Sequence, residues 1–389
     1  MKPKMKIHLF TGMLAFALLF AGCEDNDQPV YGANKPDPNP TGKAAATITG
    51  ITPTVGFLKD EIVINGSGFD TEPSFNMVRF GNKVGTVTAA TATSLTVITP
   101  NVNDATVDVQ VAVKGSEFWS NNSAFTFLPT LELLAEDINW ANGIEVDDNN
   151  NVYIGARNDG QIIKIAPDGT RSVFADVPVG GQLRFGPGGY LYVCAVDENK
   201  VIRVSADGSS IEDYAFADAA VSIDWDAAGN TYIVSRDAGI NVMDTGGNMT
   251  YIDLDGAPVK NCRVFDGYLY INRIWDGTIT RFPITGGSLG AEEPYLETDG
   301  LSPSSFDFDE NGVMYWAHAW EGNLYTLNPD GTPGETLYEG ELYPNDSPMR
   351  YMTFRNRAIY AAFPCWGGDC GAALKAYIGV QEAPNYGRD

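Results

Sequence analysis

A motif built around a tyrosine recurs six times between Asn142 and the C-terminal end of the chain. Each copy combines a short apolar run, a polar turn, a second run that carries the tyrosine, and a third run. The tyrosines are Tyr153, Tyr192, Tyr232, Tyr270, Tyr315 and Tyr360, at separations of 39, 40, 38, 45 and 45 residues. A period near 40 with three or four strands per unit is typical of a β-propeller blade, which cannot bury both its faces alone. The sequence therefore predicts a closed ring of six blades.

The turn and strand residues of the repeat fit this fold. The first copy runs from Asn142 to Gly169 as NGIEVDDNNNVYIGARNDGQIIKIAPDG, and the fifth from Phe306 to Gly331 as FDFDENGVMYWAHAWEGNLYTLNPDG. Asn and Gly tolerate the positive φ of tight hairpins, whereas Val, Ile, Tyr and Phe favour strands. Over roughly residues 131–389 these units resemble NHL-type and gluconolactonase-type six-bladed propellers. The resemblance implies the fold but leaves the activity open, since such propellers include binders, scaffolds and hydrolases.

A spare strand precedes the first copy. We assign residues 129–389 to the propeller, and within it Leu131–Ala135 has no partner among the six copies. We expect this strand to pair beside Leu374–Ile378 and close the last blade, because an open ring would leave sheet edges exposed. Trp225 and Trp316 fall inside predicted strands, and we expect both in the core.

Residues 1–22 have the pattern of a secretory signal. Three lysines precede an apolar run over residues 9–20, and an Ala-Gly pair comes directly before Cys23. The run is short for a membrane span and fits a cleaved signal. The cysteine after Ala-Gly resembles the bacterial lipobox, which implies that Cys23 is lipidated, although Phe20 departs from the usual small aliphatic residue. Acyl chains would anchor the protein to the lipid bilayer, and ordinary signal cleavage nearby is the alternative.

Residues 23–45 have the composition of an exposed tether. An EDND run follows the cysteine, and residues 28–45 are rich in Pro, Asn, Gly and Lys without an apolar period. Such composition is typical of flexible spacers. The acidic run resembles the surface-export signal of some Gram-negative glycan-uptake lipoproteins. That resemblance implies an outer-membrane lipoprotein that faces the cell exterior beside a transporter, and a merely solvated tether is the alternative.

Residues 46–128 form a separate unit. The run ITGITPTVGFLKDEIVINGSGF is followed by NMVRFG, SLTVITP and VDVQVAV, whose alternating valines fit a strand with one buried face. The unit closely resembles an IPT/TIG domain, a small immunoglobulin-like sandwich. The expected fold class is therefore all-β, an immunoglobulin-like sandwich followed by a six-bladed β-propeller. The unit shows no catalytic constellation, and in secreted lipoproteins such a domain usually serves as a spacer or docking arm.

Charge and residue content exclude several partners and cofactors. The formal net charge of −25 opposes binding to nucleic acid or anionic headgroups, because phosphate contacts need cationic side chains. Without the signal, His318 is the one histidine, which excludes a histidine-rich zinc site. We expect no metal or cofactor, with calcium as the alternative that Asp-rich turns would suit without EF-hand-like spacing. Cys365 and Cys370 are expected to form a disulfide in an oxidising exterior rather than to hold a metal.

Aromatic residues fall on loops that a propeller places on one face. Three tryptophans follow second strands, one precedes the first blade, and a tyrosine precedes the sixth. These residues are Trp140, Trp275, Trp320, Trp366 and Tyr343. Flat rings stack on sugars, and exposed aromatic clusters mark binding sites. We therefore predict a ligand-binding face that includes these rings, with burial in the core as the alternative.

Charged residues are predicted on the same face, just beyond second strands or at the start of a blade. They are Arg157, Asp197, Arg236, Asp237, Arg273, Asp276, His318 and Arg350. An arginine could hold the carboxylate of a uronic acid through two parallel hydrogen bonds. The alternative is that these residues pair with one another as surface ion pairs, which contribute about 0–1 kcal/mol each.

Three functions compete on this sequence. The first is a non-catalytic surface lipoprotein that binds an oligosaccharide or polysaccharide for uptake. The second is a protein-interaction scaffold, as NHL propellers often are. The third, implied by the gluconolactonase resemblance, is a hydrolase whose divalent cation sits in the central channel on carboxylate and amide oxygens. Its candidate ligands are Glu145, Asp224 and Asn261, and Glu145 would face the channel only if the strand register shifts.

Overall fold

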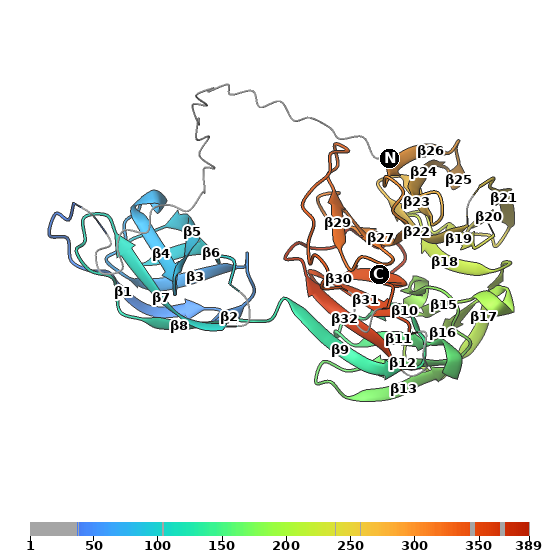
Figure 1. The fold of residues 1–389 in the computed structure, drawn as a ribbon, viewed down its shortest axis with the longest axis horizontal. Helices are drawn as coiled ribbons and strands as arrows, with labels where there is room; N and C mark the ends of the chain where they lie inside the picture. The colour runs from blue at the N-terminus through green and yellow to red at the C-terminus, as the bar shows by residue number, and fades with distance from the viewer. Residues whose placement is uncertain are drawn as a thin grey trace, which may run out of the picture. The chain divides into compact units, whose positions relative to one another are not determined.

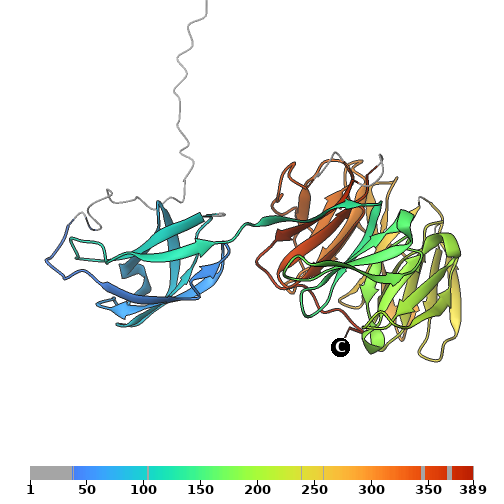
Figure 2. The same ribbon diagram turned by 90° about the horizontal axis from the view of Figure 1, so that it is seen from below.

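The computed structural model describes residue 37 and residues 39–388, without 103–104, 238, 257, 343–346 and 366–369. Apart from four short 3-10 turns, its regular elements are β-strands (Figures 1 and 2). They form two compact units, a sandwich followed by a propeller. Among the described residues, no helix is long and apolar enough to cross a membrane. The predicted signal and the predicted lipidation site Cys23 lie outside the described residues.

The first unit is an immunoglobulin-like sandwich with the strand order β1-β3-β6-β5-β4-β7-β8-β2. Its elements are β1 (Thr47–Thr52), β2 (Val55–Gly56), β3 (Glu61–Ser67), η1 (Pro73–Phe75), β4 (Asn76–Phe80), β5 (Lys83–Ala90), β6 (Ser94–Ile98), β7 (Ala105–Val113) and β8 (Ser123–Phe127). The core is built from alternate residues, such as Ile62 and Ile64 on β3. Val109 and Val111 on β7 are also buried, which confirms the predicted strand with one buried face.

The second unit is a propeller of six sheets. Blades 1 and 2 are β10 (Ala141–Val146), β11 (Val152–Ala156), η2 (Arg157–Asp159), β12 (Gln161–Ile165) and β13 (Arg171–Asp176), then β14 (Leu183–Phe185), η3 (Pro187–Gly189), β15 (Leu191–Ala195), η4 (Val196–Glu198), β16 (Lys200–Val204) and β17 (Ile211–Phe216). Blades 3 and 4 are β18 (Ala220–Trp225), β19 (Thr231–Ser235), β20 (Gly239–Met243) and β21 (Met249–Asp253), then β22 (Val259–Phe265), β23 (Tyr268–Arg273), β24 (Thr278–Thr285), β25 (Ser288–Leu289) and β26 (Glu293–Glu297). Blades 5 and 6 are β27 (Pro303–Phe308), β28 (Met314–His318) and β29 (Leu324–Leu327), then β30 (Tyr351–Arg355), β31 (Ala358–Phe363), β32 (Gly371–Tyr377) and β9 (Leu131–Ile138).

The six sheets close into a ring. The innermost strands β10, β14, β18, β22, β27 and β30 contact one another in turn around the axis. In the last blade β9 pairs with β32, and Leu133 lies opposite Leu374. This pairing, visible in Figure 1, confirms the predicted role of Leu131–Ala135 as the closing strand. The ring is thus completed by a strand from its own N-terminal end, and β9 forms the outer edge of blade 6.

The repeated tyrosine is buried in the second strand of every blade, and in several blades it bonds to the preceding turn. In blade 3 the Tyr232 hydroxyl donates to the carboxylate of Asp226 at 3.0 Å. The same carboxylate accepts hydrogen bonds from the backbone N–H groups of Ala228 and Asn230. Blades 1 and 5 repeat this arrangement with an Asp six residues before the tyrosine. The Asp therefore fixes the hairpin turn and also satisfies a buried hydroxyl.

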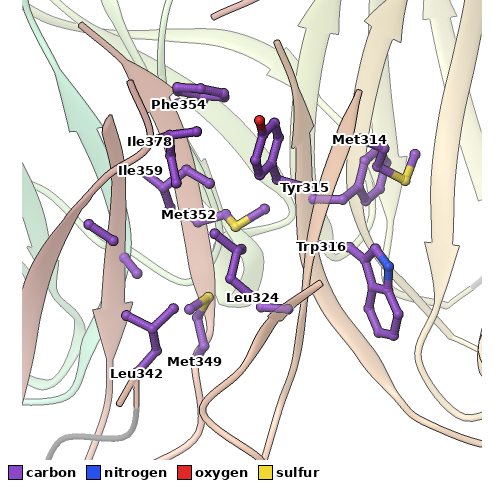
Figure 3. Close-up of a cluster of buried hydrophobic side chains, with 14 of the residues drawn as sticks. Met314, Tyr315, Trp316, Leu324, Leu342, Met349, Met352, Phe354, Ile359 and Ile378 are labelled. Atoms are coloured by element: carbon purple, nitrogen blue, oxygen red, sulfur yellow. The ribbon is translucent and has the colours of Figure 1, made fainter. Parts of the chain in front are cut away.

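Apolar side chains between neighbouring blades form the core of the propeller. Figure 3 shows one cluster, in which Tyr315 of blade 5 points toward Met352 and Phe354 of blade 6, and the ring centroids of Tyr315 and Phe354 are 5.3 Å apart. Trp225 is fully buried in another cluster. The burial of Trp225 and Trp316 confirms their predicted place in the core.

The last residues of the chain cover one end of the channel. Residues 381–388 lie against the ends of innermost strands, and the Ala383 N–H donates to the Phe308 carbonyl at 2.9 Å. The Arg388 guanidinium lies 3.0 Å from the Glu145 carboxylate. Both figures of the whole chain place its C-terminal end against the propeller. The channel is therefore covered by this tail at one end, and ligands would reach it from the other.

Candidate functional site

The antiparallel order of each blade places two sets of loops on one face of the propeller. The start of an innermost strand pairs with the end of the second strand, as Ala141 does with Ala156 in blade 1 and Ala220 with Ser235 in blade 3. The loops that lead into the blades therefore lie beside the loops that connect second and third strands. We call this side the loop face. Near it the pairing shifts in blades 1, 3, 4 and 5, as a β-bulge would produce.

A cavity of about 120 Å³, the axial cup, opens on the loop face. Its lining residues are Trp140, Asn142, Arg157, Gly180, Val196, Val221, Arg236, Val259, Lys260, Ile274, Arg350 and Tyr351. They come from blades 1, 2, 3, 4 and 6, or from the loops that lead into them. Because five blades can share one cavity only near the centre of the ring, the axial cup marks the mouth of the central channel.

One tyrosine bounds the axial cup from below. Tyr351 starts the innermost strand of blade 6, and its hydroxyl donates to the carbonyl oxygen of Val221 at 3.2 Å. Val221 belongs to the innermost strand of blade 3, which lies across the ring from blade 6. The buried ring of Tyr351 therefore spans the channel and separates the axial cup from the interior below.

Four cationic side chains converge on the axial cup, namely Arg157, Arg236, Lys260 and Arg350. Burial lowers the pKa of Lys260 well below its ordinary value, and the nearby Arg350 lowers it further. Burial also lowers the pKa of Arg350, to which the positive charge of Arg157 contributes in the same direction. These shifts show that the three charges lie close enough together to repel one another.

Among the described residues, the carboxylates that pair with this cluster lie on its outer side. Asp197 pairs with Arg157 at 2.7 Å, and Asp237 lies 3.7 Å from Arg236, where both side chains are exposed. Among the described residues that line the axial cup, none carries a carboxylate. The centre of the loop face is therefore positively charged, although the whole chain has a formal net charge of −25.

A groove of about 620 Å³ continues from the axial cup between blades 1 and 2. Its lining residues are Trp140, Arg157, Asn158, Asp159, Gly160, Pro178, Val179, Gly180, Ala195, Val196 and Asp197. Trp140 and Arg157 line both spaces, so the two are continuous. Trp140 is half-buried and has a φ of 61°, a left-handed conformation that few residues other than glycine adopt. The strained backbone at Trp140 holds the indole ring where the groove meets the axial cup.

A second groove, of about 570 Å³, lies between blades 2 and 3 on the same face. Phe216 and Tyr251 line it and are 72% and 56% exposed. Neither residue was predicted, because both belong to outermost strands, whereas the predicted face consists of loops after second strands and the starts of blades. Lys260 was not predicted either. It stands two residues before Cys262 in the fourth copy of the repeat, and Arg350 stands two residues before Met352 in the sixth copy. This shared spacing was visible in the sequence.

The structure separates the predicted site residues into two groups. Trp140, Arg157, Arg236 and Arg350 meet at the axial cup, as the predicted face required. The other described residues lie on loop-face segments of blades 4 and 5 and do not line the axial cup or the groove between blades 1 and 2. These are Arg273, Trp275, His318 and Trp320.

Each residue of this second group either lies beside a carboxylate or is exposed to solvent. Arg273 is buried and pairs with Glu292 at 2.8 Å. Burial lowers the pKa of His318, and Glu321, whose carboxylate lies 3.9 Å away, partly opposes that shift. Trp275 and Trp320 are 74% and 50% exposed, so the core alternative does not apply to them. The rings therefore share a face with the axial cup but do not converge on it.

Two predicted aromatic residues, Trp366 and Tyr343, lie outside the described residues. The structure joins Cys365 to Cys370 in a disulfide, with 5.3 Å between their Cα atoms. In the sequence Trp366 lies between these two cysteines.

The carboxylates of the channel are already engaged with arginines. Glu145 is fully buried beside Thr353 of blade 6, so the register condition for facing the channel is met. Its Oε1 atom accepts hydrogen bonds from Arg388 and Thr353. Asp224 is held by Arg263 at 3.1 Å and by a second arginine at 3.3 Å. The only Glu145 oxygen without a partner in the described part of the chain is Oε2.

A divalent cation does not fit this set of residues. Asn261 accepts a long hydrogen bond of 3.5 Å from the Phe306 N–H, and its two proposed co-ligands are paired with guanidinium groups. Three or more carboxylate, histidine or cysteine side chains do not gather at any point of the described chain as a metal centre would need. The gluconolactonase-like ligand set predicted as an alternative is therefore not assembled.

The comparison with known families identifies the first unit. Residues 46–127 match the IPT/TIG domain. The eight-stranded sandwich is consistent with this match. In sequence, no curated protein matches the chain.

Solved structures share the fold of the chain at low sequence identity. A Bacteroides thetaiotaomicron protein of unknown function has a TM-score of 0.53 at 15% identity, covering 87% of this chain and 99% of that one. An auxiliary nutrient binding protein from Bacteroides ovatus has a TM-score of 0.51 at 15% identity, with the same coverage. A putative gluconolactonase has a TM-score of 0.54 at 12% identity, covering 66% of this chain and 94% of that one. The first two matches extend beyond the propeller into the IPT/TIG domain, whereas the third covers about the propeller alone.

Proposed function

We propose that the chain captures a carbohydrate nutrient on the loop face of its propeller and holds it without cleaving it. The observation that carries this proposal is the continuous space formed by the axial cup and the groove between blades 1 and 2. Its aromatic wall is Trp140 and its polar wall includes Arg157, both of which line the two parts. An indole ring can stack on a sugar face while a guanidinium bonds to its polar substituents.

The size of the site suits a short oligosaccharide rather than a single small molecule. The groove of about 620 Å³ falls within the range of about 300–1,000 Å³ that is common for ligand sites. The axial cup, at about 120 Å³, is smaller than that range and suits one substituent of a ligand. The ligand would therefore lie along the groove and insert one group into the mouth of the channel.

The channel residues favour binding over hydrolysis. Glu145 and Asp224 are paired with arginines deep in the channel, and the ring of Tyr351 lies between them and the axial cup. His318 lies in blade 5 and does not line the axial cup. A ligand in the axial cup would thus meet cations and an aromatic ring, not the acid–base pair or metal that hydrolysis needs.

The setting of the site also supports nutrient capture at the cell surface. The Bacteroides ovatus neighbour named as an auxiliary nutrient binding protein shares the fold of both units. The lipobox-like cysteine at position 23 and the acidic run after it would anchor the chain at the outer membrane, facing the exterior. From there the bound carbohydrate would pass to an outer-membrane transporter, with the IPT/TIG domain as a spacer.

Isothermal titration calorimetry of the purified full-length chain against a panel of neutral and acidic oligosaccharides would test this proposal. We expect saturable binding that survives EDTA and leaves the ligand chemically unchanged. Trp140→Ala should weaken binding about tenfold or more, as the loss of a central aromatic contact does. The Trp275→Ala/Trp320→Ala double variant would measure whether the ligand also reaches blades 4 and 5.

A matched control separates the site from general effects of removing exposed rings. Phe118 of the IPT/TIG domain is 63% exposed, and Phe118→Ala should leave the affinity unchanged. Absence of binding to every glycan of the panel would contradict the proposal and favour a protein-interaction scaffold. Loss of binding in EDTA, or breakdown of the ligand, would instead favour the metal-dependent hydrolase.

A further inference from the structure

We propose that the axial cup is an oxyanion site that selects glycans bearing a carboxylate or sulfate group. This inference rests on the proposed function for the identity of the carrier molecule, but the anion specificity follows from the axial cup itself. The group would enter the mouth of the channel, and the rest of the glycan would lie in the groove between blades 1 and 2.

The geometry of the cations carries the inference. The four side chains come from separate parts of the ring: Arg157 from blade 1, Arg236 from blade 3, Lys260 from blade 4, and Arg350 from the loop before blade 6. Charges from one strand could be a solvated surface, but charges from four blades meet only because the ring brings them together. A cavity walled by one sign of charge concentrates its electric field on a ligand of opposite sign.

Burial opposes the charge of two of these cations. Lys260 is half-buried, with its ammonium 5.2 Å from the centre of the Tyr351 ring. The lowered pKa values of Lys260 and Arg350 show that burial disfavours their charged forms. Apolar residues at these positions would avoid that cost. An anion in the axial cup would neutralise the mutual repulsion and supply acceptors for the N–H donors, which gives the cluster a purpose.

The surroundings restrict where the anion can sit. The groove between blades 1 and 2 carries Asp159 and Asp197, which would repel a second negative charge. In the axial cup, by contrast, no described lining residue is a carboxylate. Guanidinium groups form two parallel hydrogen bonds to a carboxylate or a sulfate, and the ammonium adds a third direction. The structure thus assigns the anionic substituent to the axial cup and the uncharged part of the glycan to the groove.

Three probes test this assignment on the full-length chain. An oligogalacturonide and its fully methyl-esterified form share one backbone, and the third probe is a sulfated galactan oligomer of the same length. We expect the two anionic probes to bind about tenfold or more tightly than the ester, since a hydrogen bond to a charged group adds about 1.5–3 kcal/mol, and 1.4 kcal/mol is a factor of ten. Added salt should weaken the anionic probes and leave the ester almost unaffected.

Two lysine variants separate the axial cup from the general charge of the protein. Lys260→Met should reduce the affinity for the oligogalacturonide about tenfold while leaving the ester unchanged. Lys200→Met removes a lysine of similar charge on β16, which pairs with Asp213 at 2.8 Å and lies outside the axial cup. That control should bind all three probes as the unchanged chain does. Circular dichroism would establish that both variants are folded.

The outcomes distinguish this inference from the proposed function. Equal affinity for the acid and its ester, or an unchanged acid affinity in folded Lys260→Met, would overturn the oxyanion site while glycan capture stands. If no oligosaccharide binds, glucuronate and inorganic sulfate are the next probes. Binding of either one that Lys260→Met abolishes would support the oxyanion site although glycan capture had failed. Absence of binding to these small anions as well would overturn both.

Discussion

The guanidinium of Arg388 lies 3.0 Å from the carboxylate of Glu145, and both side chains are almost completely buried. Glu145 belongs to the first blade and Arg388 to the last residues of the chain, so the pair ties the two ends of the propeller together across the channel. The guanidinium also donates to the carbonyl oxygen of Val146. This relationship has two consequences, since it closes the channel opposite the axial cup and occupies the acidic residue that a lactonase-like metal site would need.

Removal of Arg388 should therefore destabilise the propeller strongly. Arg388→Met leaves the Glu145 carboxylate buried without its partner, and breaking a buried pair from one side costs about 3–5 kcal/mol. Urea denaturation would measure the loss in the free energy of unfolding. Arg203→Met is the matched control, because its pair with Glu212 is partly exposed and should contribute about 1 kcal/mol or less. Equal losses in the two variants would show that the buried pair stabilises the propeller no more than an exposed pair does.

Much of the fold could be predicted because its cause is local and repeated. The Asp-turn-Tyr segment of blades 1, 3 and 5 fixes a hairpin within a few residues. The tyrosine itself recurs in every copy, and its recurrence gives the number of blades. The closing strand followed from the same logic, since Leu131–Ala135 was the one strand left over. The tail could not be found in this way, because Arg388 lies beyond the last copy and pairs with a residue far away in the sequence.

The sequence could predict which face of the propeller carries the candidate site, but not which residues of that face come together. Topology alone places Trp275 and Trp320 on the loop face, and the structure agrees. Whether a ring on that face points to the axis depends on loop conformation, such as the left-handed backbone at Trp140, which no strand pattern encodes. For Lys260 the position within the repeat was visible in the sequence. Its approach to Arg350 could not be predicted, because it depends on the closed ring.

The Asp–Tyr pair inside the repeat should contribute measurably to stability. Tyr232→Phe removes a buried hydroxyl that donates to Asp226 at 3.0 Å, and we expect a loss of about 1–2 kcal/mol. The loss stays moderate because Asp226 keeps its bonds to the turn. In blade 6 the residue six positions before Tyr360 is Phe354, so Tyr360→Phe should cost less. Urea denaturation of the two variants would reveal the difference, and the opposite order would contradict this role of the Asp.

Replacement of Lys260 should increase stability even though it weakens anion binding. Burial lowers the pKa of Lys260 in the folded chain below its value of 10.5 in the unfolded chain. The unfolded chain therefore binds more protons between these two pKa values, and the stability of the protein rises with pH in that window. Lys260→Met should raise the melting temperature at neutral pH and flatten this part of the pH profile. A lower melting temperature would mean that the lysine has a structural partner and is not reserved for a ligand.

Anion binding at the axial cup should decrease as the pH rises toward 10.5, the ordinary pKa of lysine. Lys260 must be protonated to attract an oxyanion, and burial makes it lose its charge below that pH. The groups that face it are Arg157, Arg236, Arg350 and Tyr351. Burial raises the pKa of Tyr351, so its hydroxyl stays neutral to higher pH than that of a free tyrosine.

The titrating group can be identified by comparing variants. Affinity for the oligogalacturonide, measured by calorimetry at several pH values, should fall in the unchanged chain and in Lys200→Met. In Lys260→Met the affinity should be low and independent of pH, because the lysine that titrates has been removed. A bound anion favours the protonated lysine, so the fall should occur at higher pH in the complex than in the unliganded chain. A pH dependence that persists in Lys260→Met would place the titrating group elsewhere and remove the lysine from the site.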